Sequence, residues 1–371
     1  MPLVAAMLVC ALAFLAACGD DGEQRRTPPA DRLADALQRE LDTRRDEFDV
    51  VGITAAVAFD HGGVWSGASG LADTAPPRPM RPDTPLAIAS LTKPLTAALA
   101  VALAQEGRLS LDDRLSRWVP EFPNARAITL RQLLSHTSGL SGVDESEAYV
   151  EAVLRRRSRE WTPAMVLRYV GRPYARPGRS WHYSDTNYTL MGLVLRRASA
   201  AGVAEAMHRH VLDRHGMREA ALQPEEPAPQ GAARGFDAVD GPGPAPGRYV
   251  PFRSIASSEW TAAGAVATAP QLARWGRDLF AGRVVGDRGL REMLRLVPAG
   301  RVYKRYGLGL AQRHIVERDV LGASGRLWGY NSELWHDPLT GATVAVLWND
   351  TLLLRSPVVA DSLLEVVRRH R

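Results

Sequence analysis

Strand patterns lie near both ends of this chain, and helical patterns fill much of the sequence between them. Four segments have strand composition and are joined in pairs by short turns: Gly52 to Phe59 with Val64 to Ser69, and Ser332 to His336 with Ala342 to Trp348. Apolar spacing predicts an amphipathic helix over Asp31 to Phe48. A last helix is predicted from Ser356-Pro357 to about Arg369. These patterns predict an α+β fold in which both termini build one antiparallel sheet flanked by helices.

The sequence pattern in the middle of the chain predicts a mainly helical region beside this sheet, over about residues 92–215. The segment Pro224 to Gly247 is rich in Pro, Gly and Ala and is expected to be a long surface loop. With 371 residues, 46% of them hydrophobic, the chain can bury a sizeable core, which excludes collagen, a coiled coil and a wholly disordered protein. The net charge of +5 comes from 46 basic and 41 acidic residues without a long block of one sign, so no nucleic-acid partner is expected.

The N-terminus has the pattern of an export signal. Leu3 to Ala17 is an apolar run, shorter than the about 20 residues that span a bilayer, and residues 1–17 are interpreted as a signal peptide. The sequence Leu15-Ala16-Ala17-Cys18 resembles a bacterial lipobox, which makes Cys18 the expected lipidation site, residues 18–30 a flexible tether and residues 31–371 one catalytic domain. The alternative is an ordinary secretory signal cleaved nearby. The lipobox interpretation predicts an exported bacterial lipoprotein anchored to the extracytoplasmic face of the cell membrane.

The segment Ser90-Leu91-Thr92-Lys93-Pro94 has the spacing of a nucleophile and its base. Proline is tolerated only in the first turn of a helix, so the apolar helix that follows must begin close to Ser90. Ser90 and Lys93 then share one face of that turn, where a neutral amine can take the proton of the hydroxyl. Only two of the 46 basic residues are lysines, Lys93 and Lys304, which favours a specific role for Lys93. The alternative interpretation is a serine that caps the helix and a solvated lysine.

Two further segments have the composition of a site. Tyr183 and Asp185 directly precede an apolar helix, where they are either functional groups or a packed ring and a helix cap. Gly322-Ala323-Ser324-Gly325 places small residues on a strand, which lets another backbone approach closely or forms a simple bulge.

Together, and in this order, these three segments resemble the serine β-lactamase and penicillin-binding-protein superfamily. The similarity covers roughly residues 50–350 and is greatest to the branch of class C β-lactamases, D-Ala-D-Ala carboxypeptidases and related esterases. It implies an antiparallel sheet flanked by helices, with the active site between the sheet and a helical region. His136 and Ser138 match a segment of the fold and are interpreted as structural.

The resemblance also implies roles for individual residues. Ser90 is the expected nucleophile, Lys93 its proton acceptor and Tyr183 the group that carries a proton to the leaving group. Ser324 and Gly325 match the third motif, and the backbone N–H groups of Ser90 and Arg326 are the expected oxyanion hole.

Two positions depart from the common motifs of the family. Asp185 stands where Asn is common, and Ala323 stands where Lys or His is common. A carboxylate near Lys93 favours the protonated amine and weakens it as a base, unless the carboxylate points away or is itself protonated. Ala323 removes the cation that commonly meets the carboxylate of a β-lactam or a peptide, although Arg326 offers a replacement.

The leading prediction is an active serine hydrolase that works through an acyl-enzyme on D-Ala-D-Ala-type cell-wall peptides, small esters or β-lactams. The alternative is a catalytically weakened cell-wall binding or sensing protein of the same fold. No cofactor is expected. No metal site is expected either, because the chain has no His-Glu-x-x-His and its nine histidines show no ligand spacing. The expected partners are a small-molecule or cell-wall peptide substrate and, through the lipid anchor, the membrane.

Overall fold

The computed structural model describes residues 29–237, 240–300, 302–315, 318–351 and 358–370. The predicted signal peptide, Cys18 and the Ser356-Pro357 helix start lie outside these residues. No helix among the described residues is both long and apolar enough to cross a membrane.

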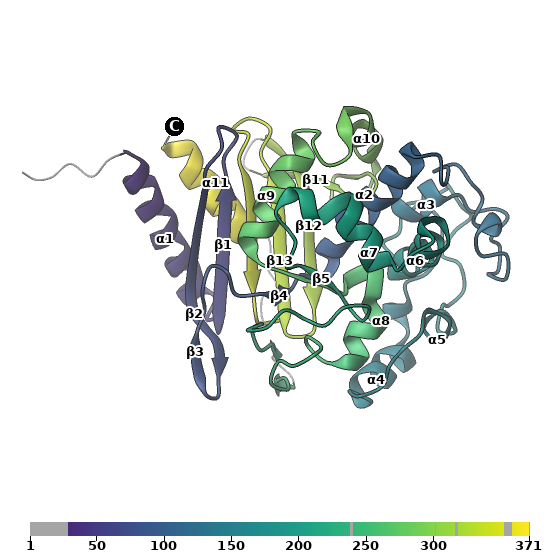
Figure 1. Ribbon diagram of the computed structural model, residues 1–371, viewed down its shortest axis with the longest axis horizontal. Helices are drawn as coiled ribbons and strands as arrows, with labels where there is room; N and C mark the ends of the chain where they lie inside the picture. Colours follow the sequence, from purple (N-terminus) through teal and green to yellow (C-terminus); the bar gives the residue numbers. More distant parts are fainter. Residues whose placement is uncertain (1–28, 238–239, 301, 316–317, 352–357, 371) are drawn as a thin grey trace, which may run out of the picture.

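A nine-stranded antiparallel sheet forms the centre of the molecule, and its first and last strands in chain order, β1 and β14, lie side by side in it (Figure 1). Across the sheet the order is β3 (Pro77–Pro79), β2 (Val64–Thr74), β1 (Gly52–Ala58), β14 (Thr343–Trp348), β13 (Tyr330–His336), β12 (Arg318–Leu327), β11 (Ala311–Ile315), β10 (Arg305–Tyr306) and β9 (Val297–Pro298). The N-terminal strand β1 pairs with the C-terminal strand β14 from Ile53↔Trp348 to Ala58↔Thr343. The predicted sheet built by the two termini is therefore confirmed.

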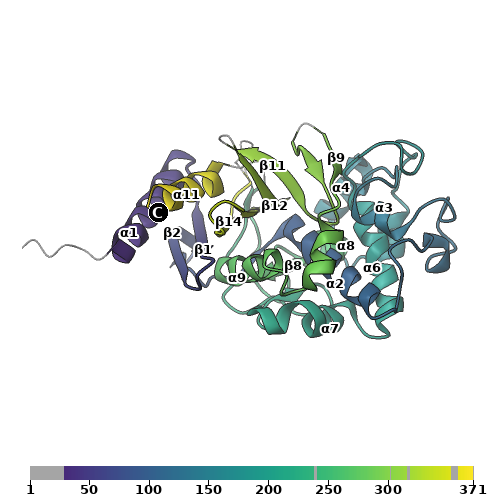
Figure 2. The ribbon, with the colours of Figure 1, turned by 90° about the horizontal axis from the view of Figure 1, so that it is seen from above.

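Helices cover the two faces of this sheet. α1 (Pro29–Glu47) and α11 (Val358–Arg369) lie against each other on one face, and α9 (Ala269–Phe280) packs on the other (Figure 2). Successive side chains of β1 point to opposite faces of the sheet. Ala55 and Val57 pack with α1 and α11, whereas Ala56 and Ala58 belong to the core on the other face. Because helices cover both faces, every residue of β1 and β14 is buried, and apart from Thr54 and Thr343 these residues are apolar or glycine.

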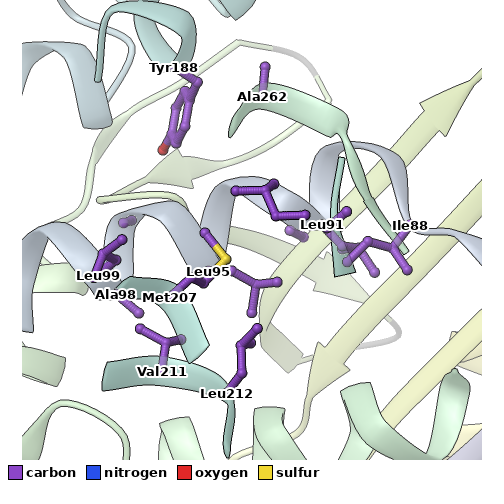
Figure 3. Packing of buried hydrophobic residues seen from close by; sticks show 14 of the residues in the cluster. Ile88, Leu91, Leu95, Ala98, Leu99, Tyr188, Met207, Val211, Leu212 and Ala262 are labelled. Atoms are coloured by element: carbon purple, nitrogen blue, oxygen red, sulfur yellow. The ribbon is translucent and has the colours of Figure 1, made fainter. Parts of the chain in front are cut away.

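The helical region stands beside the sheet, around α2 (Thr92–Gln105). Eleven of the fourteen residues of α2 are buried, as expected of a helix that is apolar on all sides. Tyr188 lies on one side of α2, and Met207, Val211 and Leu212 lie on the opposite side (Figure 3). The other helices and helical turns of this region are η2 (Leu115–Arg117), α3 (Leu130–Leu134), η3 (Val143–Glu145), α4 (Glu147–Arg155), α5 (Pro163–Leu167), α6 (Asp185–Ser199), α7 (Val203–Met207), the π-helical turn η4 (His208–Leu212), η5 (Asp213–His215), α8 (Arg253–Ala263) and α10 (Gly286–Met293).

Two expectations about this part of the chain need correction. The helical region does not end near residue 215, because α8 packs against α2, α4 and α6. The segment 224–247 is not a simple surface loop either. It forms the short strands β6 (Phe236–Asp237) and β7 (Gly241–Pro242), and Ala233 is fully buried with its carbonyl accepting from the hydroxyl of Tyr330 at 2.7 Å. The small apolar residues of this segment allow part of it to pack closely against the rest of the protein, although its composition predicted exposure to solvent.

Candidate active site

Ser90 lies in a tight turn between a strand and a buried helix. The strand β4 (Leu86–Ala87) pairs with β8 (Ala265–Ala267), which also pairs with β5 (Ala221–Leu222), and the 3₁₀ turn η1 (Ala89–Leu91) leads directly into α2. Ala89 has φ +50°, a left-handed conformation that costs a residue with a Cβ about 1 kcal/mol or more. The hydroxyl of Thr92 donates to the carbonyl of Ala89 at 2.7 Å and supports this conformation. The strained turn presents Ser90 at the start of α2, the position that Pro94 predicted.

Lys93 lies one turn after Ser90 and is 1% exposed. Its Nζ donates to Ser90 Oγ at 2.9 Å and to the carbonyl of Ala262 at 3.0 Å. Nζ also lies 4.8 Å from the ring centre of Tyr183 and 5.5 Å from that of Tyr188. A neutral amine held by other acceptors can direct its lone pair at the serine hydroxyl, which is the geometry that proton removal requires.

Tyr183 approaches Ser90 from the other side. Its hydroxyl donates to Ser90 Oγ at 2.8 Å. Burial raises the pKa of Tyr183 well above its usual value, and the negative charge of Asp185 raises it further. The phenol is therefore protonated at neutral pH and is suited to donate a proton rather than to accept one.

His136 supports the Tyr183 side chain from behind. Its ring stacks on that of Tyr183 with centroids 4.3 Å apart, and its Nδ1 accepts from the N–H of Ser184 and the amide of Asn187, both at 3.1 Å. Burial, and then the charge of Lys93, hold the pKa of His136 well below its usual value, so the ring is neutral. The His136 ring packs directly against a residue of the site, and its interpretation as a structural residue stays a prediction.

Asp185 is the first residue of α6 and points at Lys93. Its Oδ1 lies 2.6 Å from Lys93 Nζ, an ion pair in which Asp185 is 16% exposed and Lys93 is buried. Of the two arrangements that would leave Lys93 a stronger base, a carboxylate turned away from the amine is therefore excluded. The charge at position 185 acts directly on the proposed base.

Strand β12 borders the site with a free edge. Its pairing with β11 ends at Gly322, so from Ala323 to Leu327 it pairs only with β13. A Cβ at Gly325 would lie 2.7 Å from the backbone nitrogen of Ser90, so only glycine lets the strand approach this closely. Ser324 contacts the hydroxyl of Tyr303 at 2.8 Å. Arg326 is exposed and makes no ion pair or hydrogen bond with any side chain that the structure describes.

The structure thus brings Ser90, Lys93, Tyr183, Asp185 and Gly325 together, and leaves the Arg326 side chain in solvent. No sequence pattern pointed to the carbonyl of Ala262, which is aimed at Lys93 beyond a kink in α8 at Trp260, where φ is +36° and ψ −116°. Among the described residues, no group of three or more His, Cys, Asp or Glu side chains is placed to hold a metal ion.

A serine hydroxyl in contact with a buried lysine and a tyrosine, beside a free strand edge, defines a serine hydrolase of the serine–lysine type. The comparisons with known proteins agree. A family model described as Beta-lactamase matches residues 37–367, and the chain therefore belongs to the Beta-lactamase family.

Individual relatives differ in what they are named for. Esterase EstB of Burkholderia gladioli is 32% identical over 219 residues, 53% of this chain and 53% of that protein. Penicillin-binding protein 4* of Bacillus subtilis (strain 168) is 29% identical over 158 residues, 40% of this chain and 33% of that protein. The chain thus matches about half of the length of the first relative and a third of the second. The D-amino acid amidase from Ochrobactrum anthropi SV3, complexed with L-phenylalanine amide, superposes with a TM-score of 0.77 at 25% identity, over 91% of this chain and 97% of that one.

Proposed function

We propose that the protein hydrolyses small acyl substrates through an acyl-enzyme on Ser90. In this mechanism Ser90 Oγ attacks the substrate carbonyl carbon while its proton passes to the neutral amine of Lys93. Tyr183 gives a proton to the leaving group and regains one from the Lys93 ammonium. Water then attacks the acyl-serine ester, its proton returns to Ser90 Oγ by way of Lys93, and the free acid leaves. The observation that carries the proposal is the pair of contacts on Ser90 Oγ, 2.9 Å from Lys93 Nζ and 2.8 Å from the hydroxyl of Tyr183.

The oxyanion of the tetrahedral intermediate would be stabilised by the backbone N–H groups of Ser90 and Arg326. The close packing of Gly325 on the Ser90 backbone supports this role, because it brings the next residue of β12 beside the serine. Removing one such donor in other enzymes costs about 10²- to 10³-fold in rate.

The preferred substrates of the proposed enzyme lack a carboxylate. Ala323 is buried and has no charge, and the site has no lysine or histidine where its relatives commonly place one. A lost charge-assisted hydrogen bond of ~1.5–3 kcal/mol lowers affinity or rate about ten- to a hundredfold. A neutral ester never makes that contact and loses nothing, so we propose that neutral esters are hydrolysed better than β-lactams or D-Ala-D-Ala peptides.

A three-substrate panel tests this function: a chromogenic cephalosporin, a D-Ala-D-Ala peptide and a short-chain nitrophenyl ester. The native protein should turn over the ester with the highest kcat/KM, and Ser90→Ala should abolish turnover together with labelling by a fluorophosphonate. Ester turnover that persists in Ser90→Ala would remove Ser90 from the mechanism.

Two variants test whether the site lacks a cation for the substrate carboxylate or whether Arg326 supplies that cation. Ala323→Lys should shift the panel towards the carboxylate-bearing substrates. If the exposed Arg326 already supplies the cation, the native protein turns these substrates over well and Arg326→Ala impairs them selectively. If the native protein hydrolyses carboxylate-bearing substrates efficiently and Arg326→Ala does not change this, then both the missing-cation hypothesis and the Arg326 hypothesis are contradicted.

A second candidate function is a catalytically weakened binding or sensing protein. The observation that favours it is the 2.6 Å ion pair between Asp185 and Lys93, which stabilises the charged form of the amine. Under this alternative, Ser90 is not labelled by a fluorescent penicillin or a fluorophosphonate, whereas peptidoglycan fragments still bind.

We further propose that the protein is exported and held at the membrane by a lipid on Cys18. The Leu15-Ala16-Ala17-Cys18 sequence supports this location. Stable anchoring needs more than one acyl chain, as in the usual bacterial modification. Cys18→Ser should release the protein from the membrane fraction or leave its signal uncleaved, and unchanged attachment and processing would contradict the proposal.

A further inference from the structure

A cavity of about 680 Å³, which we call the α5–α6 cavity, lies in the helical region away from Ser90. It is enclosed by α5 and the residues that follow it, by the second half of α6, and by the segment 119–124. α5 packs against α6, at the end of the molecule opposite α1 (Figure 1, Figure 2). Among the residues that the structure describes, the lining of this cavity shares none with the candidate active site. Its volume is in the range of small-molecule sites, about 300–1,000 Å³.

The wall of the α5–α6 cavity is formed mainly by aliphatic and aromatic side chains. They come from four separate segments of the chain, so the tertiary fold creates this apolar surface and no single helix face does. Leu140 and Leu193 are buried, whereas Leu167 and Val170 are half-buried nearer the surface. An apolar group gains free energy by leaving water for such a wall. The six larger apolar residues of the wall are Val119, Phe122, Leu140, Leu167, Val170 and Leu193.

The charged residues of the α5–α6 cavity are exposed at its rim, and positive charge exceeds negative charge there. The guanidinium groups of Arg168, Arg196 and Arg197 and the one carboxylate of Glu121 give the lining a net charge of +2. Arg197 lies 3.3 Å from Glu121, but these side chains are 45% and 63% exposed, so the pair is weak. Arg196 lies over the ring of Trp260, 5.4 Å from its centre. Arg168 makes no ion pair or hydrogen bond with the side chains that the structure describes.

We propose that the α5–α6 cavity binds a carboxylate with an apolar tail, a free fatty acid. The tail lies against the apolar wall, and the carboxylate accepts N–H groups of Arg168 and Arg197 at the rim. A guanidinium presents its donors in a planar fork that matches the two oxygens of a carboxylate, and it is only weakly hydrated. An apolar wall below a cationic rim therefore complements a ligand that has one anionic end. The inference goes beyond the proposed function and does not depend on it.

Isothermal titration calorimetry with octanoate and 1-octanol at neutral pH tests the two parts of the ligand. The probes have the same tail, and only octanoate is charged. We expect octanoate to bind about tenfold more tightly or better, because its carboxylate forms charge-assisted hydrogen bonds. Arg168→Gln should weaken octanoate severalfold and leave 1-octanol unchanged. The matched control is Arg291→Gln, since Arg291 is an exposed arginine of α10 outside the cavity and should not affect either probe. Equal affinity of the native protein for the two probes would overturn the proposal.

A second variant tests whether the probes bind in this cavity. Ala164 is an exposed residue of α5 that lines it, so Ala164→Trp should fill part of the space and weaken octanoate and 1-octanol alike, by about tenfold or more. Ser90→Ala should bind octanoate as tightly as the native protein does. Octanoate binding that Ala164→Trp and Arg168→Gln both leave unchanged, or that Ser90→Ala abolishes, would overturn the proposal. A dimer that Ala164→Trp dissociates, together with no octanoate binding, would assign the cavity to a second copy of the chain instead.

Discussion

At the scale of the residue, the candidate active site depends on the three polar contacts of one lysine, Lys93. Nζ of Lys93 contacts Ser90 Oγ, the carbonyl of Ala262 and the carboxylate of Asp185. The contacts with Ala262 and Asp185 hold the amine in place, and the contact with Ser90 is the one that the proposed mechanism uses. An arginine cannot take this role, because the guanidinium does not give up its proton in proteins.

We therefore expect Lys93→Arg to lose ester turnover by about 10²- to 10⁴-fold, the usual contribution of a general base. The other lysine of the chain is the control: Lys304 is exposed and pairs with Asp319 at 3.1 Å. Lys304→Arg should keep the native rate. A Lys93→Arg variant that also keeps it would mean that the proton leaves Ser90 by another route.

Asp185 should affect ester turnover through its charge, because its Oδ1 lies 2.6 Å from Lys93 Nζ. A carboxylate at this distance favours the protonated amine over the neutral amine that the proposed mechanism needs. Asp185→Asn should therefore raise kcat/KM for a neutral ester at neutral pH severalfold or more, which steady-state kinetics of the two proteins measure. A lower kcat/KM in Asp185→Asn would show that Asp185 holds the amine in place instead.

At the scale of the element, the site depends on one close approach of a strand to a helical turn. β12 contacts η1 through Gly325, and the hydroxyl of Ser332 on β13 donates to the carbonyl of Ile88 at 2.7 Å. These contacts fix the sheet against the turn that holds Ser90. Each involves the backbone of that turn, and backbone cannot move aside as a flexible side chain can.

Gly325→Ala should therefore separate β12 from η1. The added Cβ would lie 2.5 Å from Ser332 Oγ and 2.7 Å from the nitrogen of Ser90, so we expect the stability to fall by about 1–3 kcal/mol and ester turnover to fall by about tenfold or more. Gly247→Ala is the control, because a Cβ added there would meet no atom within 4 Å and its φ is not positive. Unfolding by urea and ester kinetics give the two readouts. Native turnover in Gly325→Ala would contradict a role for this packing.

At the scale of the whole molecule, the helical region is stabilised by ion pairs as well as by its core. His208, in η4, lies with Nδ1 2.7 Å from Asp213 and Nε2 3.2 Å from Glu226. The hydrogen bond with Glu226, opposed in part by burial and supported by Asp213, raises the pKa of His208 from 6.5 to about 9. Both ring nitrogens can donate only when the imidazole is charged.

Because the charged form of His208 is favoured in the folded protein, the free energy of unfolding should fall as the pH becomes alkaline. The folded-state pKa lies above the unfolded value, so the contribution of His208 is fully present below about pH 6.5 and is lost as the pH rises through about 9. The loss of unfolding free energy in His208→Asn should thus be largest near pH 6 and small near pH 10. His61→Asn is the control, because His61 is exposed between β1 and β2 and makes no ion pair with the residues that the structure describes. A His208→Asn deficit of equal size at both pH values would contradict the linkage.

Much of this molecule was predictable because its signals are local. Turn residues and alternation identified the two hairpins, and Pro94 located the start of α2 to within a few residues. The order of three motifs indicated the family that the match over residues 37–367 confirms. The interpretation of segment 224–247 as a surface loop was incomplete, because the burial of residues such as Ala233 depends on neighbours such as Tyr330, which composition does not reveal.

The sequence by itself determined which elements form and which residue types are available for chemistry, since helix starts, turns and strand periodicity depend on neighbours a few residues away. Only the tertiary structure decided how these groups act on one another. It turned Asp185 towards Lys93, aimed the carbonyl of Ala262 at the same nitrogen and placed His136 behind Tyr183. The physical reason is that charge and burial act through space, and the groups that meet at Ser90 come from separate segments of the chain.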